Sequence, residues 1–454
     1  MIQQERIQSL NRRPERRGRF ILYWLQASQR AACNHALEYA LGEANVRNLP
    51  LVVFFGLTGD FPEANARHYR FMIEGLQEVQ RDLEGRGIRM VVRIGNPPGR
   101  VLELAEEAAL IVTDRGYLRI QKAWRQAAAQ AAPCTLLQVE TDAVVPVETA
   151  SDHEEYAAAT LRPKIQRHLE DYLVPLNEGP TRRDSLGLHL ESLALDNAEA
   201  LLTELGIDRT VGASSFYRGG YREAKRRLNA FLGEKLARYG RERNVPGSDA
   251  SSSLSPYLHF GQISPLEIAL AVQETSAAGP EARQAFLEEL VVRRELAINF
   301  VHYNDAYDRC EGAVPHWARL SLQAHSGDAR PYLYGPADWE NARTHDPYWN
   351  AAQREMVRRG KMHNYMRMYW GKKILEWSAS PEEAFRTALS LNNRYALDGR
   401  DPNGFAGVAW CFGRHDRPWK ERSIFGKIRY MNAAGLERKF DMKPYLTSFA
   451  EDAS

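Results

Sequence analysis

"LVVFFGLTGDFPEANARHYRFMIEGLQEVQRDLEGRGIRMVVRI", residues 51–94, contains the pattern that decides the fold. Residues 51–55 and 89–94 at its two ends are short runs of β-branched and aromatic residues, which are typical of strands. Residues 64–87 between them carry apolar side chains at helical spacing and close on glycine. A strand, a helix and a strand in this order form the repeating unit of a parallel sheet with helices on both faces.

The same alternation continues through the first part of the chain. The predicted strands are residues 20–25, 51–55, 89–94, 110–113 and 136–140. A sheet of this kind usually binds its ligand at the carboxyl ends of the strands. No GxGxxG and no GxxxxGK[ST] follows the first strand, so the sequence does not specify that ligand. We therefore predict a Rossmann-like α/β domain with a parallel sheet over residues 1–150, without a dinucleotide fingerprint.

The pattern changes after residue 150, where the β-branched runs end. Residues 177–193, "NEGPTRRDSLGLHLESL", have the composition of a linker, and long helical patterns follow as far as Phe440. We predict an interdomain linker over residues 151–195 and an all-α domain over residues 196–454.

Composition narrows the possible functions. The chain has 454 residues and a formal net charge of +2, so nucleic-acid binding would need a local basic patch. Its four cysteines lie far apart, without CxxC or HExxH, which argues for a reducing compartment and against a zinc site. No long apolar window, no signal-peptide core and no heptad repeat is present. We expect a cytoplasmic monomer without a membrane segment.

Residues 247–264, "GSDASSSLSPYLHFGQIS", place a run of serines before Pro256, which suits the first position of a helix. Hydroxyls and free backbone N–H groups at such a turn suit a phosphate. On this stretch alone, a capped helix after a flexible loop is the simpler interpretation.

Residues 286–304, "FLEELVVRRELAINFVHYN", combine apolar and charged side chains. The charged residues, at i,i+4 or neighbouring positions, are Glu288, Glu289, Arg293, Arg294 and Glu295. Such pairs usually occupy a solvated face. Because this helix is also strongly apolar, its pattern favours burial of one carboxylate with a raised pKa.

Residues 361–377, "KMHNYMRMYWGKKILEW", place Trp370, Ile374 and Trp377 on one stripe of a helix. An aromatic core stripe explains this spacing most simply. A third indole, Trp349, precedes Trp370 by 21 residues, and its position relative to the stripe does not follow from spacing.

Residues 392–431 contain "LDGRDPNG", which fails the calcium-loop pattern because Arg400 stands at the third position. Basic and aromatic residues then alternate: Arg414, Arg417, Lys420, Arg422, Lys427 and Arg429 with Trp410, Trp419, Phe425 and Tyr430. The mixture fits a nucleic-acid surface, with cations on phosphates and rings on bases, as well as it fits a core helix with a charged outer face.

Taken together, five motifs closely resemble class II cyclobutane pyrimidine dimer photolyases: "SSSLSPYLHFGQISP", "THDPYWNAAQ", "GKMHNYMRMYWGKKILEW", "LDGRDPNGFAGVAW" and "HDRPWKERSIFGKIRYM". The resemblance spans nearly the whole chain and is dense from Ser251 onward. It implies an N-terminal antenna domain and a helical domain that holds FAD. It also implies the reaction, in which light excites reduced FAD, an electron passes to a dimer flipped out of DNA, the cyclobutane ring splits and the electron returns.

The resemblance also implies roles for individual residues near FAD. Arg367 and Asp398 match an ion pair beside the flavin, and Asn392 matches the amide that faces flavin N5. The other implied FAD contacts are Tyr239, Ser251, Ser252, Ser253, Leu254, Ser255 and Asn403. A chain of indoles that photoreduces FAD, from flavin to surface, is matched by Trp370, Trp349 and Trp377.

For the lesion, the resemblance implies that Glu289 hydrogen-bonds the dimer. The pocket wall and the DNA contacts are matched by Tyr365, Met368, Trp410, Arg417, Trp419 and Arg429. Arg293 departs from the pattern, because some relatives place a tryptophan there; one wall of the pocket would then be a guanidinium with Trp410.

Three other functions remain open at this point. A cryptochrome-like light sensor would keep FAD and the indoles but would not need Glu289, the lesion pocket or the basic aromatic segment. Repair of (6-4) photoproducts needs paired histidines, and none lies near Glu289. A non-enzymatic DNA-binding protein would leave the indoles unexplained. The expected partner is double-stranded DNA containing pyrimidine dimers, and the antenna is a deazaflavin, a folate or none, with family habit favouring a deazaflavin.

Overall fold

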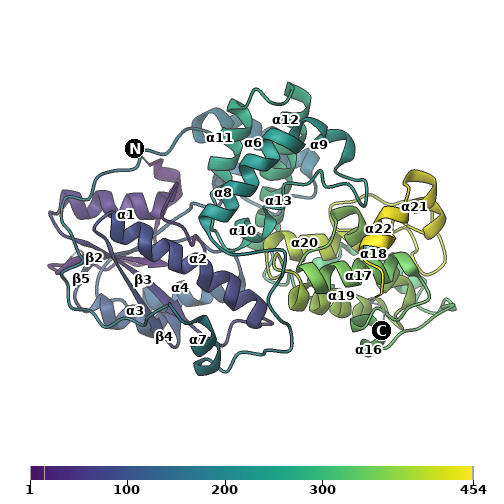
Figure 1. The fold of residues 1–454 in the computed structure, drawn as a ribbon, viewed down its shortest axis with the longest axis horizontal. Coiled ribbons are helices and arrows are strands. Elements are labelled where there is room, and N and C mark those ends of the chain that lie inside the picture. The colour runs from purple at the N-terminus through teal and green to yellow at the C-terminus, as the bar shows by residue number, and fades with distance from the viewer. Residues whose placement is uncertain (1, 15, 452–454) are drawn as a thin grey trace.

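The computed structural model describes residues 2–14 and 16–451 of the chain. Its N-terminal α/β part (purple and blue in Figure 1) contains a sheet covered by helices, and the rest of the chain is helical (teal to yellow). The predicted fold class is confirmed.

The sheet has six strands in the order β1-β6-β5-β2-β3-β4. Their bounds are β1 Ile7–Ser9, β2 Phe20–Leu25, β3 Leu51–Leu57, β4 Arg89–Ile94, β5 Ala108–Asp114 and β6 Leu136–Val139. The five predicted strands are present and run parallel to one another. The sequence did not predict β1, which pairs antiparallel with β6, because a three-residue edge strand with two exposed positions carries no strong hydrophobic signal.

Helices cover both faces of the sheet. Alternate residues of β2 point to opposite sides: Ile21 and Tyr23 join the core under α1 (His35–Val46) and α2 (Ala66–Gly85). Leu22 and Trp24 join the core under α3 (Pro97–Ala105) and α4 (Arg119–Ala131). This burial on both faces explains why the strands read as continuous apolar runs.

Within the described residues, no strand follows β6, and a single isolated bridge pairs Arg422 with Gly426. The helices up to residue 303 are α5 Val147–Ala150, α6 Ala158–Tyr172, α7 Ala198–Glu204, α8 Tyr221–Ala230, α9 Leu236–Glu242, α10 Ser255–His259, α11 Pro265–Glu274, α12 Pro280–Leu287 and α13 Arg294–Tyr303. Those that follow are α14 Cys310–Ala313, α15 His316–Ala324, α16 Pro336–Glu340, α17 Pro347–Arg359, α18 Asn364–Trp377, α19 Pro381–Tyr395, α20 Pro402–Cys411, α21 Ala433–Lys439 and α22 Lys443–Ser448. A short 3-10 turn, Gln4–Arg6, precedes β1, and π-helical turns lie at Phe231–Lys235 and Glu288–Arg293.

The predicted linker is not a free tether. Its residues 158–172 form α6, and a later part runs back along the edge strand β4, where the N–H of Leu193 donates to the carbonyl of Val92 at 2.8 Å. The N–H of Arg89 donates to Ser185 Oγ at 2.7 Å. Beyond it, α7 packs on α2 of the α/β part (Figure 1). The boundaries of independently folding domains therefore stay a prediction.

None of the helices in the described residues is both long enough and apolar enough to cross a membrane.

Candidate functional site

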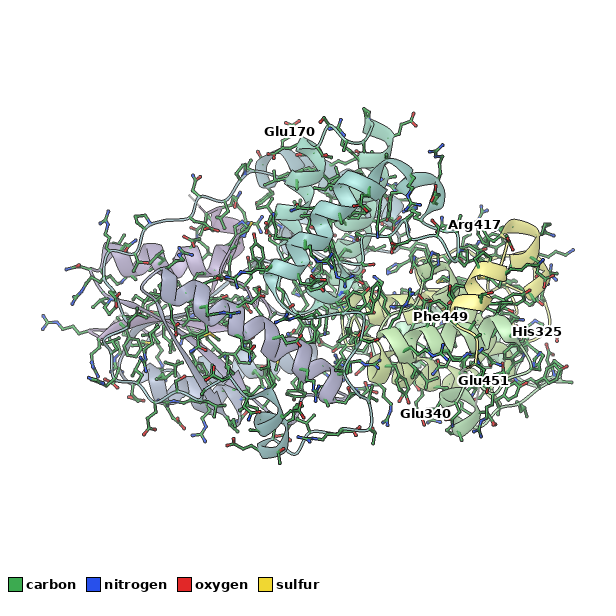
Figure 2. The ribbon with its side chains drawn as sticks, in the orientation of Figure 1. Glu170, His325, Glu340, Arg417, Phe449 and Glu451 are labelled. Atoms are coloured by element: carbon green, nitrogen blue, oxygen red, sulfur yellow. The ribbon has the colours of Figure 1, made fainter. Side chains whose placement is uncertain are left out.

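A cavity of about 260 Å³ opens in the helical part of the molecule. The serine turn before α10 forms one side, the connection from α17 to α18 another, and α22 with Phe449 a third; Figure 2 labels Phe449. Its polar lining includes Ser248, Asp249, Ser251, Ser253, Glu355, Arg359, Lys361 and His363.

The serine turn adopts a strained local shape. Ser253 has a φ of 55°, in the left-handed region that L residues rarely occupy, while Leu254 is buried and anchors the turn. Ser251 and Ser253 line the cavity, whereas Ser252 and Leu254 do not. The turn therefore presents hydroxyls at the start of α10, as a phosphate-binding turn would.

A buried charge cluster adjoins this turn. Asp398 accepts hydrogen bonds from Ser255 Oγ at 2.7 Å and from Arg367 Nη2 at 2.9 Å. Lys361 Nζ donates to the same Ser255 Oγ at 2.5 Å. Burial alone would raise the pKa of Asp398, but Arg367 and Lys361 beside it hold that pKa well below its usual range. The predicted ion pair between Arg367 and Asp398 is present, and Lys361 is a second cation that sequence reasoning missed.

Four buried polar atoms in α17 to α19 and the segment between α17 and α18 have no partner within the described chain: Gln353 Nε2, His363 Nδ1, Arg367 Nε and Asn392 Oδ1; of these residues His363 lines the cavity. Leaving such an atom unpaired costs about 1–3 kcal/mol, so these atoms are candidates to bond a ligand. Burial and the nearby Lys361 lower the pKa of His363 to about 4, so this ring is neutral at pH 7. The set combines cations, hydroxyls and an unpaired amide oxygen, which fits a ligand with phosphates and a hydrogen-bonding ring system such as FAD.

Four buried indoles lie close together beside α18. Trp370 and Trp349 stack with ring centroids 6.3 Å apart and an interplanar angle of 9°. Trp339 packs against Trp349 at 4.9 Å and stacks on Trp377 at 6.3 Å. The three indoles of the prediction therefore meet, with Trp339 between Trp349 and Trp377.

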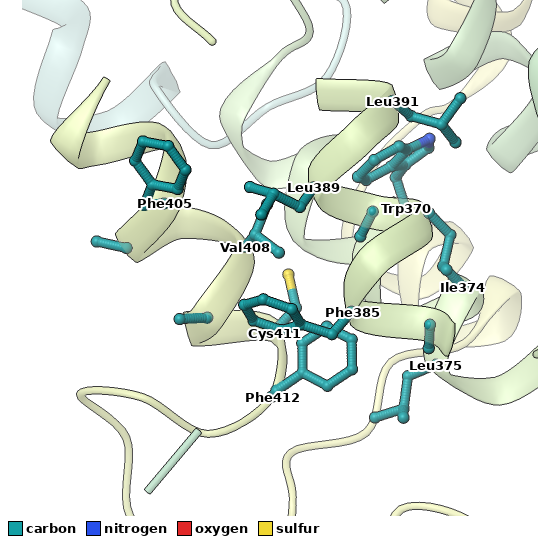
Figure 3. Close-up of a cluster of buried hydrophobic side chains, with 14 of the residues drawn as sticks. Trp370, Ile374, Leu375, Phe385, Leu389, Leu391, Phe405, Val408, Cys411 and Phe412 are labelled. Carbon is teal, nitrogen blue, oxygen red and sulfur yellow. The ribbon is translucent and has the colours of Figure 1, made fainter. Parts of the chain in front are cut away.

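The predicted outer end of this array is wrong, because Trp377 is only 2% exposed. Tyr334 packs against it at 5.8 Å, and Tyr332, which is 45% exposed, stacks on Tyr334. Trp370 also belongs to the hydrophobic core (Figure 3), where it lies near Ile374 and Leu391. Trp370 is therefore both a part of the hydrophobic core and a member of the indole array.

The charged helix of residues 286–304 is not a regular α-helix. Residues Glu288–Arg293 form a π-helical turn, a distortion that is frequent at functional sites. The expected i,i+4 pairing is wrong here: Arg293 approaches Glu288 at 3.4 Å, and Glu289 pairs instead with Arg243 of α9's C-terminal end at 2.6 Å. The carboxylate drawn into the interior is Glu295, whose pKa burial raises to about 8.

The residues assigned to the lesion fall into three groups. The guanidinium of Arg293 lies 5.5 Å from the ring of Trp410. Met368 contacts Cys411, the neighbour of Trp410. Tyr365, three residues before Met368 on α18, packs edge-on against Phe440 at 4.9 Å.

The basic aromatic segment forms a separate surface patch. Trp419 is 41% exposed, and the guanidinium groups of Arg417 and Arg429 lie 5.6 Å and 5.2 Å from the centre of its ring. Figure 2 shows Arg417 at the outer edge of the helical part. An exposed indole flanked by two cations fits contact with a nucleic acid better than a core helix.

Of the residues assigned to FAD, only Ser251 and Ser253 line the cavity. The others, which do not line it, are Tyr239, Ser252, Leu254, Ser255, Arg367, Asn392, Asp398 and Asn403. Tyr239 packs against Phe231 and Phe286, with the Arg243 guanidinium 5.5 Å from its ring. Asn403 is exposed at the start of α20, where its N–H donates to Asp401. The cavity is lined instead by Tyr217, Arg359, Met362 and Tyr445, among others, which no spacing rule could bring together from distant segments.

A second cavity, of about 100 Å³, lies at the carboxyl ends of β2 and β3. It is lined by Trp24, Phe55, Phe61 and Trp124 of the α/β part and by His259, Phe260 and Arg400 of the helical part, with others. Its place agrees with the expectation for a parallel sheet.

Comparison with known proteins identifies the family. A family model described as DNA photolyase matches residues 21–181. A deoxyribodipyrimidine photo-lyase from Methanothermobacter thermautotrophicus is 53% identical over 447 residues, which cover 98% of this chain and 98% of the relative. The chain belongs to the DNA photolyase family. Another member of the photolyase family, the deoxyribodipyrimidine photo-lyase of Potorous tridactylus, is 42% identical over 93% of this chain and 80% of its own length.

Solved structures of photolyases and of a cryptochrome share the fold. A class III photolyase from Agrobacterium tumefaciens superposes with a TM-score of 0.74 at 19% identity, covering 96% of this chain and 87% of that chain. A Synechocystis cryptochrome gives a TM-score of 0.74 at 16% identity, covering 96% and 89%. Because repair enzymes and light sensors share this architecture, the fold alone does not separate them.

Proposed function

We propose that this chain is a light-driven repair enzyme that splits cyclobutane pyrimidine dimers in DNA, of the class II type, with FAD as its catalytic cofactor. The observation that carries the proposal is the placement on one helix, α18, of Arg367, which pairs with Asp398 at the candidate flavin site, and Trp370, which opens the stack of indoles. A flavin site joined to a conducting array is what photoreduction requires.

FAD, when bound, would absorb light and transfer single electrons. The chain's own residues would hold FAD and supply it with electrons. Ser251, Ser253, Arg359 and Lys361 would bind its phosphates, and the unpaired Asn392 Oδ1 would accept a hydrogen bond from its ring system. Because successive indole centroids lie only 6.3, 4.9 and 6.3 Å apart, the indoles would pass an electron inward in short steps.

The lesion would be held by the π-helical turn and α20. Glu289 at the turn would accept hydrogen bonds from the dimer, and Arg293 with Trp410 would form one wall. Flipping a dimer out of the duplex costs a few kcal/mol, less than for an intact base pair. The exposed Trp419, with Arg417 and Arg429, would contact the opened duplex. The partner is double-stranded DNA containing dimers, with the chain acting as a monomer.

For the cavity at the strand ends we propose an antenna chromophore, with a deazaflavin favoured over a folate. Its aromatic lining, including Trp24, Phe61 and Trp124, suits a flat ring system, since rings stack well on aromatic walls. Chromophore released from the purified protein by heat and identified by mass tests this choice.

The experiment that tests the proposed function measures two activities in one preparation: bleaching of bound flavin under blue light and restoration of thymines in a dimer-containing oligonucleotide. We expect both. Bleaching without restoration would indicate a cryptochrome-like sensor, and the absence of both would indicate a DNA-binding protein without this chemistry.

A further inference from the structure

The α/β part holds the end of α19, the helix that carries Asn392. Carbonyls at a helix C-terminus have no partner within the helix. Here the carbonyl of Arg394 accepts from Asn65 Nδ2 at 2.7 Å, and that of Tyr395 accepts from Arg67 Nη1 at 2.7 Å. Both donors come from the start of α2. The position of Asn392 therefore depends on contacts across the two parts of the molecule.

One contact of this region reaches the neighbour of Asn392 directly. Asn393 Nδ2 donates to the Glu63 carboxylate at 2.5 Å, and Asn393 Oδ1 accepts from the N–H of Arg400 at 2.9 Å. Asn393 is 1% exposed, and Arg400 Nη1 also donates to its carbonyl at 2.9 Å. Glu63 and Arg400 both have a φ of 57°, a strained conformation for L residues that persists only where surrounding contacts hold it.

These partners fix the orientation of the Asn393 side-chain amide, and Asn393 in turn fixes that of Asn392. A carboxylate only accepts hydrogen bonds and a backbone N–H only donates them, so the side-chain nitrogen of Asn393 must face Glu63 and its oxygen must face Arg400. That oxygen also lies 3.5 Å from Asn392 Nδ2. Rotating the Asn392 amide by half a turn would place two oxygens against each other. Asn392 therefore turns Nδ2 toward Asn393 and leaves Oδ1, which is buried and unpaired, free for a ligand.

We propose that Glu63 is a positioning residue that, through Asn393, orients the Asn392 amide so that its oxygen faces the flavin. This inference rests on the proposed function, because it needs a flavin at Asn392. Reduced flavin carries a hydrogen on N5 that can be donated, whereas N5 of oxidised flavin only accepts. A fixed amide oxygen at that atom favours the reduced form, and a freely rotating amide does not.

The test measures the equilibrium reduction potential of bound flavin in three variants. Glu63→Ala removes one of the two groups that orient Asn393 and leaves only the N–H of Arg400. The amides of Asn393 and Asn392 are then held more loosely, so we expect about a tenfold loss in the equilibrium constant for two-electron reduction, a shift of about 30 mV to lower potential. Asn393→Asp sets two carboxylates against each other, and we expect a shift at least as large.

The double variant Glu63→Gln with Asn393→Asp reverses donor and acceptor. The introduced amide nitrogen at position 63 can donate to one oxygen of the introduced carboxylate at position 393, and the other oxygen can still accept from Arg400 and Asn392. We expect this exchange to restore the wild-type potential, which a purely structural contact would not do. Asp60→Asn, an exposed change in the same loop, is the matched control and should leave the potential unchanged.

Flavin content measured in each preparation separates the possible failures. An unchanged potential in Glu63→Ala with full flavin content, or no rescue by the double variant, would overturn the role of Glu63 and leave the proposed function standing. A wild-type chain that binds no flavin would overturn both.

Discussion

At the scale of single residues, the site is defined by charges and amides whose partners come from distant segments. Asp398 lies between Arg367 and Lys361, and both cations are drawn from the stretch 361–367. The resemblance named Arg367 and Asp398, since both lie in quoted motifs. It did not name Lys361, because a lysine in a basic segment gives no sign of burial until the chain is folded. Nor could the sequence indicate that Glu63, in a loop of the other part, bonds to Asn393.

Replacing Asp398 by asparagine should reduce FAD content and stability together. Asp398→Asn leaves Arg367 and Lys361 buried without a counter-charge, which typically costs about 3 kcal/mol. Thermal unfolding and the ratio of flavin to protein absorbance check this outcome. An unchanged unfolding temperature would contradict the burial of this cluster.

The lowered pKa of Asp398 predicts that acid destabilises the folded chain. Because the pKa of Asp398 is lower in the folded than in the unfolded chain, its charge stabilises the fold above about pH 4, and this contribution is lost as the pH falls further. Urea unfolding below about pH 4 should therefore show a smaller difference between wild type and Asp398→Asn than at pH 7.

Glu289→Ala should lower the repair yield while FAD content stays constant. Glu289 lies at the π-helical turn, pairs with Arg243 and is not among the residues that line the flavin cavity. Counting repaired dimers per absorbed photon measures the effect, which we expect to be roughly tenfold, the worth of one charged hydrogen bond. Glu281→Ala, an exposed carboxylate in the first turn of α12, is the control. Equal yields in the two variants would remove Glu289 from lesion binding.

At the scale of elements, the indole array and the π-helical turn show what the sequence could and could not give. Heptad-like spacing placed Trp370 and Trp377 on one face of α18, and the structure confirms this. Spacing could not show that Trp349 stacks on Trp370, because Gly360, with a φ of 79°, turns the chain back between α17 and α18. Trp339 was missed, since α16 is a five-residue helix without periodic signal. The π-helical turn was also missed, because it leaves no mark in the apolar spacing.

Trp370→Phe should abolish photoreduction of oxidised FAD but leave repair by chemically reduced protein largely intact. Phenylalanine fills most of the buried site, yet it is much harder to oxidise than an indole. Flavin bleaching under blue light, and repair after chemical reduction in the same sample, are the two measurements. Equal loss of both activities would show that Trp370 serves the fold or the flavin site rather than electron transfer.

At the scale of the whole molecule, the two parts share a tightly bonded interface. The α/β part was readable from its alternating strands and helices, and the helical part from the loss of β-branched runs. Their contact was not readable: α2 holds the end of α19, and Glu295 of α13 accepts hydrogen bonds from the N–H groups of Val144 and Val145, at 2.6 Å for the nearer. Such pairings join residues far apart in the chain and leave no pattern within either segment.

Glu295 predicts how the stability of this interface depends on pH. Burial raises its pKa from 4.5 to about 8, so the folded chain binds an extra proton between these values. The contribution of neutral Glu295 to the free energy of unfolding is therefore fully present below about pH 4.5 and is lost as the pH rises through about 8. Each pH unit between these values costs roughly 1.4 kcal/mol. Glu295→Gln, which stays neutral, should flatten this dependence and be more stable than wild type at pH 9 by about 2 kcal/mol or more. Denaturant unfolding at pH 6 and pH 9 checks it; parallel curves for both proteins would contradict the raised pKa.

The measurement that tests the central claim most directly is repair of one cyclobutane thymine dimer in a duplex oligonucleotide by chemically reduced protein under blue light. A dark sample of the same mixture is its control. We predict that intact thymines return only in the light, with several dimers repaired per protein molecule. A flavin-loaded, fully reduced protein that restores no thymines in the light would contradict the assignment of this chain as a repair enzyme.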